Sequence, residues 1–162
     1  MIRFAKEEDT TIILEFIKEL AEYEHLLEEV SATYDVLYES LFVKKQAEVL
    51  LVEEEGKPVG FALFFHNFST FLGKANLYLE DLYVRPQYRG KGYGKALFVR
   101  LAQIAVARNC ERLDWWCLDW NTSSIAFYRS LGAVGMEDWT VYRLQKDALY
   151  ALAKQSEQRL EK

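Results

Sequence analysis

The feature that most constrains the fold is a strand-like segment that leads into a glycine cluster and then into a helix. Residues 74–84 have the apolar content of a strand, glycines stand at positions 90, 92 and 94, and apolar residues recur at helical spacing over 93–108. Such glycines let backbone N–H groups turn toward a bound oxyanion, and a helix N-terminus adds a favourable dipole. This order predicts a strand–loop–helix unit that holds a phosphate.

The residues around these glycines show which known phosphate-binding motifs the loop does not match. Arg89, Lys91 and Lys95 add positive charge to a chain whose net charge is -5. A P-loop needs Ser or Thr after its lysine, but Ala96 follows Lys95, and glycines at every second position do not match the dinucleotide fingerprint. Neither familiar nucleotide motif is present. A loop that serves only as a turn remains the alternative.

The rest of the chain predicts an α/β (α+β) fold in which a mixed sheet has helices on both faces. Helices are expected at 7–23, 31–42, 122–131 and from 146 to the end, and further strands at 2–4, 47–52, 59–66, 112–118 and 138–144. Regular alternation along 74–84 would place Glu80 and Asp81 on opposite faces of the sheet. Trp115 and Trp116 are expected in the core.

Length and composition bound the function. A chain of 162 residues is expected to form one domain, 1–162, and 51% hydrophobic residues exclude a disordered chain. An acidic chain without a basic stripe is unsuited to nucleic acids or anionic membranes, and no apolar run is long enough to span a bilayer. We read no signal peptide at the N-terminus, which favours the cytoplasm.

Cysteine and histidine usage gives no sign of a metal site. The two cysteines, Cys110 and Cys117, cannot form a disulfide framework and are expected to be small buried apolar residues. The two histidines, His25 and His66, lie far apart in the sequence and away from both cysteines. We therefore expect no metal cofactor.

The spacing Arg-x-x-Gly-x-Gly, met by Arg89, Gly92 and Gly94, resembles the GNAT superfamily of N-acetyltransferases. Four motifs in order resemble its diamine (spermidine/spermine) and thialysine acetyltransferase branch: residues 18–24, 77–81, 88–94 and 120–128. The resemblance covers nearly the whole chain. It implies a GNAT-like, mostly antiparallel sheet, acetyl-CoA as co-substrate and a homodimer, with the C-terminal stretch as a dimer contact.

The resemblance also implies where the coenzyme binds. The loop that would hold the pyrophosphate of acetyl-CoA consists of Arg89, Gly90, Lys91, Gly92, Tyr93, Gly94 and Lys95. The backbone of Leu82, Tyr83 and Val84 would pair with the pantetheine amide as an added strand does. Asn121 resembles a residue that hydrogen-bonds the coenzyme, and the alternative for it is a helix N-cap.

Acetyl transfer to an amine requires a base and an acid. A lysine-like amine has a pKa of about 10.4, so its deprotonation at pH 7 costs about 4–5 kcal/mol. The resemblance assigns Glu80 as the base, acting through water, and Tyr128 as the acid that protonates the departing thiolate. The alternatives are a surface carboxylate for Glu80 and a core aromatic for Tyr128. Asp81 is expected to be structural or a minor contact.

A cationic substrate favours carboxylates and aromatic faces. Tyr23, Glu24 and Glu28 offer both between the first two helices, and the resemblance places substrate contacts around Tyr23 and Glu24. The alternative is a solvated acidic loop. Ser69 and Phe71 stand where the polyamine enzymes carry an acidic residue and a tryptophan. That difference favours thialysine or another short amine over a long polyamine.

These observations predict an acetyl-CoA-dependent N-acetyltransferase for the primary amine of a small cationic substrate, either a diamine or polyamine or a thialysine-like amine. The amine would attack the thioester directly in a ternary complex. Two alternatives stay open. One is an acetyltransferase for peptide or protein N-termini, and the other is a non-catalytic module that senses acetyl-CoA.

Overall fold

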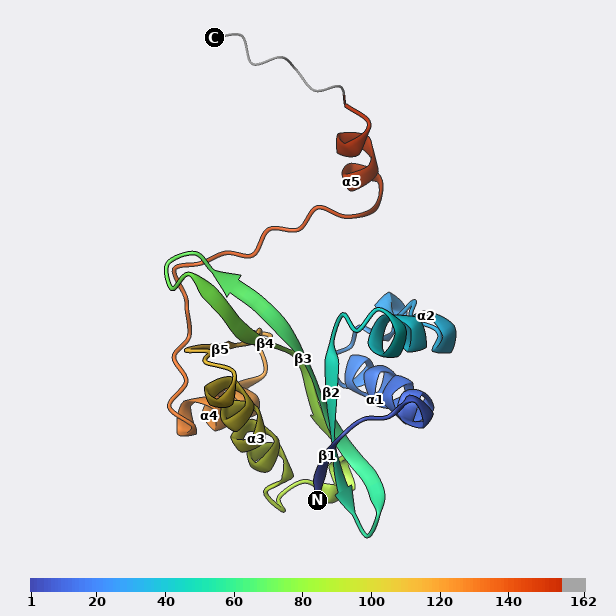
Figure 1. Cartoon of the computed structure of the whole chain (residues 1–162), viewed down its shortest axis with the longest axis vertical. Coiled ribbons are helices and arrows are strands. Elements are labelled where there is room, and N and C mark those ends of the chain that lie inside the picture. Colours follow the sequence, from blue (N-terminus) through green and yellow to red (C-terminus); the bar gives the residue numbers. More distant parts are fainter. Residues whose placement is uncertain (156–162) are drawn as a thin grey trace. The chain divides into compact units, whose positions relative to one another are not determined.

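The computed structural model describes residues 1–155, in two compact units that divide after Trp116. The first unit contains a five-stranded sheet in the order β1-β2-β3-β4-β5 (Figure 1). The strands are β1 (Ile2–Phe4), β2 (Glu48–Glu54), β3 (Lys57–Ser69), β4 (Lys74–Val84) and β5 (Leu113–Asp114). The first four strands pair antiparallel and β5 runs parallel to β4. The predicted mixed, mostly antiparallel sheet is confirmed.

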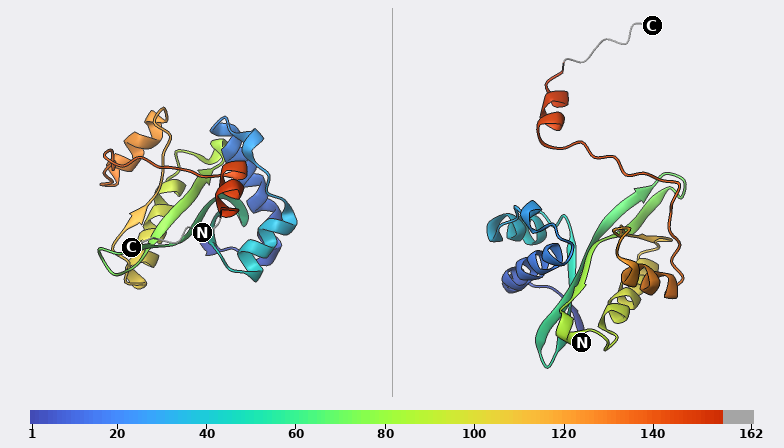
Figure 2. Two further views of the ribbon diagram at one scale, coloured as in Figure 1. Left: turned by 90° about the horizontal axis from the view of Figure 1, so that it is seen from above. Right: turned by 180° about the vertical axis from the view of Figure 1, so that it is seen from behind.

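Helices cover both faces of this sheet (Figure 2). On one face, α1 (Thr10–Tyr23) and α2 (Tyr34–Tyr38) enclose a buried core, which contains Ile13, Phe16, Leu37, Leu41, Val49, Leu51, Phe61 and Tyr83. On the other face lies α3 (Tyr93–Ala107), whose Leu97 and Leu101 are fully buried. Burying one such side chain contributes about 1.5–3 kcal/mol, so these two layers fix the positions of β4 and of the loop that follows it.

A β-bulge interrupts the pairing of β4 with β3. Leu79 pairs with Phe64 and Asp81 pairs with Leu63, which leaves Glu80 as the extra residue between them. Adjacent residues of β3 face opposite sides of the sheet, so their partners Leu79 and Asp81 do too. Besides burial, Glu80 raises the pKa of Glu24, at the end of α1, as well as that of Asp81, so it lies on the same side as Asp81. The expectation that Glu80 and Asp81 lie on opposite faces is therefore wrong, because it assumed unbroken alternation.

The strands β4 and β5 meet only at the start of β4. Leu77 pairs with Leu113 and Tyr78 with Asp114, and no later pair joins the two strands in the described part of the chain. From Leu79 onward, β4 therefore has a strand partner on the β3 side only. The backbone of residues 79–84 thus presents one edge that no strand of the first unit pairs with.

The helices begin close to the predicted positions. The predicted helix 7–23 is a 3-10 turn over Glu7–Asp9 followed by α1. The Asp9 carboxylate accepts the Lys6 N–H and binds Arg3, so it ties the helix start to β1. The second helix was predicted over 31–42. Only Tyr34–Tyr38 is α-helical, and Glu39–Val43 forms a π-helical turn.

The second unit contains α4 (Thr122–Ser130) and α5 (Lys146–Ala153). Between them the chain forms neither helix nor strand, so the predicted strand 138–144 is wrong. The predicted strand 112–118 shrinks to the two residues of β5. A strand exists only where a neighbour completes its hydrogen-bond ladder, and an apolar pattern alone does not supply one.

The end of the predicted C-terminal helix, beyond residue 155, lies outside the described residues. Within the described part of the chain, every helix is too short or too polar to cross a membrane.

Candidate active site

The loop between β4 and α3 has the backbone shape of an anion cradle. Gly90 and Gly92 adopt φ values of 78° and 84°, a left-handed conformation that costs other residues energy. Gly92 is the N-cap of α3, which brings the free N–H groups of a 15-residue helix to this loop. No neighbouring atom lies within 4 Å of a Cβ placed on either glycine. Backbone conformation, and not crowding, therefore requires glycine here.

Two of the loop's polar side chains contact Glu54, at the end of β2. The Lys91 ammonium donates to Glu54 at 2.8 Å, and the Tyr93 hydroxyl donates to the same Oε1 at 2.7 Å. Both hydrogen bonds lower the pKa of Glu54. The Lys91 charge is thus balanced by a carboxylate that the sequence analysis did not single out. Glu54 lies 37 residues before Lys91, so no local pattern could have paired them.

Arg89 connects the loop to β4 and to the end of α1. Its Nε donates to the Val84 carbonyl at 2.9 Å. Its guanidinium carbon lies 5.3 Å from the centroid of the Tyr23 ring and 5.7 Å from that of Tyr83. These contacts bring the predicted substrate residue Tyr23 beside the predicted coenzyme loop.

The backbone expected to pair with the pantetheine lies on the open edge of β4. Leu82, Tyr83 and Val84 pair with β3 on one side and have no β5 partner on the other. The Tyr83 side chain is buried and its hydroxyl donates to Glu19 at 3.2 Å. Glu19 also binds Arg85, so the end of β4 is held firmly against α1.

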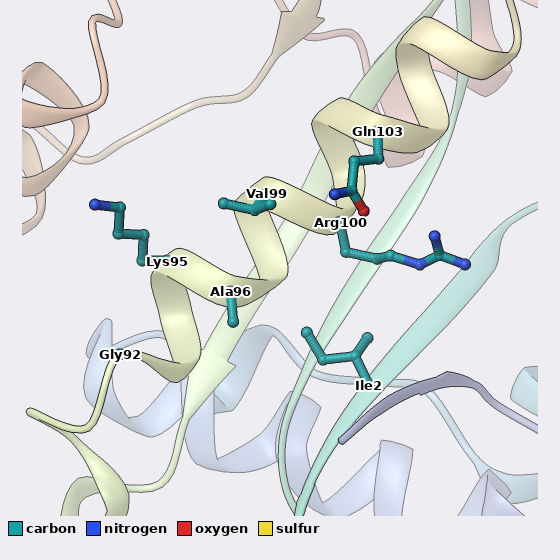
Figure 3. Close-up of a pocket in the computed structure, with 7 residues that line it drawn as sticks. All are labelled: Ile2, Gly92, Lys95, Ala96, Val99, Arg100 and Gln103. Carbon is teal, nitrogen blue, oxygen red and sulfur yellow. The ribbon is translucent and has the colours of Figure 1, made fainter.

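A shallow hollow of about 440 Å³ adjoins the loop along α3 (Figure 3). It is lined by Ile2, Gly92, Lys95, Ala96, Val99, Arg100 and Gln103. Lys95 extends to one side of the helix and Arg100 to the other, with Ala96 and Val99 between them (Figure 3). The hollow is therefore mainly apolar and carries a cation toward each side.

Three carboxyl groups, Glu24, Glu80 and Asp81, lie close together where the bulge faces the end of α1. Burial, then Glu80 and Glu24, raise the pKa of Asp81 to about 7. Burial and then Glu80 raise the pKa of Glu24, which caps the C-terminus of α1. Glu80 itself is exposed. This carboxyl cluster, Glu24, Glu80 and Asp81, is a site of accumulated negative charge that a cation would stabilise.

The remaining residues considered for substrate binding lie after α1 and in the β3–β4 hairpin turn. Glu28 is exposed in the 3-10 turn Leu27–Glu29. Ser69 ends β3, and its hydroxyl accepts the Leu72 N–H within the hairpin turn. Phe71 in that turn is 92% exposed. The first unit thus brings Tyr23, Glu24 and Glu80 together with Arg89, whereas Glu28 remains on the surface.

Asn121 and Tyr128 belong to the second unit. Asn121 is the N-cap of α4 and its side chain accepts the Ser124 N–H at 3.4 Å, so the alternative N-cap interpretation is confirmed. Tyr128 lies on α4 with its ring 5.8 Å from that of Phe127. Both roles toward the coenzyme stay predictions.

The aromatic residues after β5 and the cysteines divide between buried and exposed positions. Trp115 packs at 4.9 Å from Phe98 of α3, whereas Trp116 is 59% exposed, so the core prediction is wrong for Trp116. Cys110 is buried as expected, and Cys117 is only half-buried. Across residues 1–155, no three histidine, cysteine or acidic side chains are grouped so that they could hold a metal ion.

Known proteins resemble this chain over most of its length. A sequence profile of the acetyltransferase (GNAT) family matches residues 13–133. Thialysine N-epsilon-acetyltransferase of Bos taurus is 38% identical over 165 residues, covering 94% of this chain and 96% of that protein. Spermidine/spermine N(1)-acetyltransferase-like protein 1 of Homo sapiens is 34% identical over 94% of this chain and 23% of its own length.

Solved structures show the same fold. An integron cassette protein from the mobile metagenome of V. cholerae superposes with a TM-score of 0.79 at 30% identity. The superposition covers 96% of this chain and 98% of that one. The fold is therefore shared with an experimental structure over nearly all of both chains.

Proposed function

The chain belongs to the acetyltransferase (GNAT) family, and from that premise we propose that it acetylates the primary amine of a small cationic substrate, with acetyl-CoA as donor. GNAT acetyltransferases use acetyl-CoA. The observation that carries the choice of acceptor is the carboxyl cluster, because the bulge turns Glu80 and Asp81 toward Glu24 beside the glycine loop. A cluster of like charges is costly unless a cation binds it.

The residues of the loop fit the coenzyme. The left-handed backbone at Gly90 and Gly92 and the N-terminus of α3 suit a pyrophosphate. Arg89 and Lys95 supply charge, and Gly94 lies in the first turn of the helix, with Lys91 and Tyr93 held by Glu54 beside it. The open edge at Leu82, Tyr83 and Val84 suits the pantetheine amides, and Asn121 is proposed to add a hydrogen bond.

The proposed reaction is a direct transfer in a ternary complex. Glu80 accepts a proton from the ammonium through a water molecule, and the neutral nitrogen attacks the acetyl carbonyl. The carbon–sulfur bond then breaks, Tyr128 donates its hydroxyl proton to the thiolate, and the second proton that leaves the nitrogen restores the Tyr128 hydroxyl. No covalent enzyme intermediate forms, so all charges that develop are borne by substrates and these two side chains.

Glu24 and Tyr23 are proposed to bind the cationic end of the acceptor, with Glu28 as an outer contact. A carboxylate and an aromatic face together favour an ammonium group. Ser69 carries no charge, and its hydroxyl makes its hydrogen bond inside the hairpin turn. It therefore offers no carboxylate that could pair with the second ammonium group of a long polyamine. A thialysine-like amine is therefore the preferred acceptor.

We also propose that residues 1–162 act as one catalytic domain and that the protein is a cytoplasmic homodimer. The family profile crosses the division between the two units, which supports one domain. A dimer is supported by the second unit, where Trp139 and Tyr142 are 75% and 91% exposed and call for a covering surface.

The experiment that tests the proposal is thiol release from acetyl-CoA with a panel of acceptors at pH 7–9. The panel contains putrescine, spermidine, spermine, thialysine, lysine and short peptides, and mass spectrometry identifies the acetylated product. Turnover of a small amine supports the proposal. Turnover of peptides alone would instead show an N-terminal acetyltransferase. Tight coenzyme binding with no turnover would show a sensing module.

A further inference from the structure

We propose that Asp81 is a positioning residue that works through Glu80: it receives the proton that Glu80 takes from the substrate ammonium and so keeps Glu80 ionised. The inference rests on the proposed function and extends it from a single base to a pair of carboxyls. Asp81 itself touches neither acetyl-CoA nor the attacking nitrogen in this scheme.

The bulge provides the geometric basis. In a regular strand Glu80 and Asp81 would face opposite sides of the sheet, and a proton could not pass directly between them. Here the pairing of Asp81 with Leu63 turns it to the α1 side, where Leu63 packs against the core, and Glu80 turns the same way. The extra residue thus puts two consecutive carboxyls on one face, which unbroken pairing cannot do.

The two carboxyls differ in their exposure to solvent. Glu80 is exposed, so a substrate or a water molecule reaches it freely. Asp81 is half-buried behind it, and burial is the largest cause that raises its pKa to about 7. A proton acceptor works best when its pKa lies near the working pH, and Asp81 meets that condition.

The charged and titratable groups around Asp81 all favour its protonated form. Glu80 on its own strand and Glu24 at the end of α1 both raise its pKa. Tyr78, two residues before the bulge, has its pKa raised in turn by burial and by Glu80, Asp114 and Asp81. The influences on Asp81 are therefore acidic groups from β4 and α1. A bound ammonium would oppose them and lower the pKa of Asp81.

The proton balance of one cycle follows from this arrangement. The arriving cation lowers the pKa of Asp81, which then loses its proton to solvent and becomes a carboxylate. The ammonium N–H bond breaks, the proton passes to Glu80 and then to Asp81, and the neutral nitrogen attacks. After the attack the nitrogen still carries a second surplus proton, which passes through water to Tyr128 once Tyr128 has given its own proton to the thiolate. When the uncharged amide product leaves, Asp81 holds the first of the two protons that the ammonium lost. No electrons are transferred, and the thiol proton is supplied separately by Tyr128.

The test compares pH profiles of kcat/KM for thialysine or spermidine in the wild type and in Asp81→Asn, with Asp114→Asn as the matched control. Asp114 also acts on Tyr78 but lies on β5, outside the carboxyl cluster. We expect the wild-type rate to fall below about pH 7. In Asp81→Asn this acid limb should move by at least one pH unit, and kcat/KM at pH 8 should fall about 10- to 100-fold. Asp114→Asn should keep the wild-type profile, and Asp81→Glu should restore part of the rate. An Asp81→Asn profile that matches the wild type within twofold would overturn the proposal.

A second readout does not depend on turnover, so the inference can fail separately from the proposed function. Carbon-13 NMR follows the Asp81 carboxyl in the intact wild-type protein with and without spermidine. We expect a midpoint near pH 7 that falls when spermidine binds. A midpoint below about pH 5, or one that spermidine leaves unchanged, overturns the role of Asp81. If no amine is turned over by the wild type, the proposed function fails, whatever this midpoint is.

Discussion

Glu80 and Asp81 are adjacent in the chain but lie in different surroundings. Glu80 is exposed, whereas Asp81 is half-buried beside two other carboxyls, and only Asp81 has a pKa raised to about 7. Sequence motifs pointed to Glu80 as the base and left Asp81 as a structural residue or a minor contact. The difference lies in burial and in neighbouring charge from α1, neither of which a local motif contains.

The raised pKa of Asp81 makes stability depend on pH. In the unfolded chain Asp81 loses its proton near pH 3.8, but in the folded protein it keeps it up to about pH 7. The contribution of Asp81 to the free energy of unfolding is therefore greatest below pH 3.8, and it is lost as the pH rises from 3.8 to about 7. Asp81→Asn removes that loss, so between pH 4.5 and pH 8 the variant should gain on the order of 2–4 kcal/mol relative to the wild type.

Urea denaturation of both proteins at the two pH values measures this difference. Parallel pH dependence in wild type and variant would contradict the raised pKa.

Arg89 gives a second prediction for a single side chain. It hydrogen-bonds the Val84 carbonyl and lies over the rings of Tyr23 and Tyr83. Arg89→Ala should raise the KM for acetyl-CoA at least about 10-fold, because one charge-assisted phosphate contact is worth on the order of 1.5–3 kcal/mol. Initial rates at varied acetyl-CoA measure it. Arg100→Ala is the control. It removes an arginine that lines the hollow along α3 and should leave the KM for acetyl-CoA within about threefold. Equal effects of the two variants would contradict the assignment of Arg89 to the coenzyme phosphate.

At the level of elements, two glycines share a left-handed backbone conformation, but only one of them lies in the proposed coenzyme loop. Gly92 begins α3 with φ 84°, and Gly56 joins β2 to β3 with φ 76°; neither has a neighbour within 4 Å of a Cβ. Alanine at either position should cost about 1–2 kcal/mol through the same left-handed strain. Only Gly92→Ala should also weaken acetyl-CoA binding, by about tenfold or more. Thermal unfolding and coenzyme titration of both variants measure this. A loss of coenzyme affinity in Gly56→Ala as well would indicate a general effect of instability.

The elements that could be predicted from the sequence are those with local signals. β4 and α3 match their expected ranges to within a residue, because strand composition, glycines and helical spacing all lie within those segments. The strands at 112–118 and 138–144 were over-predicted, because a strand depends on a partner elsewhere in the chain. The bulge was missed because residues 79–82 contain no glycine or proline that marks it.

At the scale of the whole molecule, large apolar side chains are exposed in the second unit. Between residues 119 and 155 no residue is buried, although Trp139, Tyr142 and Tyr150 lie there. Such side chains favour a covering surface, and we propose that a second copy supplies it.

The dimer proposal predicts a change in mass on substitution in this segment. The double variant Trp139→Ser, Tyr142→Ser should shift the protein from dimer toward monomer at micromolar concentration, as measured by sedimentation velocity. Val106→Ser is the matched control, since Val106 is 76% exposed on α3 and lies outside the segment. It should remain dimeric. A wild type that sediments as a monomer at every concentration would contradict the proposal.

The measurement that tests the central claim most directly is the rate of acetyl transfer by Glu80→Gln, compared with the wild type at pH 7.5. The substitution keeps the size of the side chain and removes its ability to accept a proton. Because Glu80 is exposed, we expect no folding defect, and unchanged coenzyme binding would show that there is none. We predict that the wild type acetylates thialysine or a related small amine and that kcat/KM falls about 100-fold or more in the variant. Equal rates in the two proteins would contradict the assignment of Glu80 as the base and the account of the site built around it.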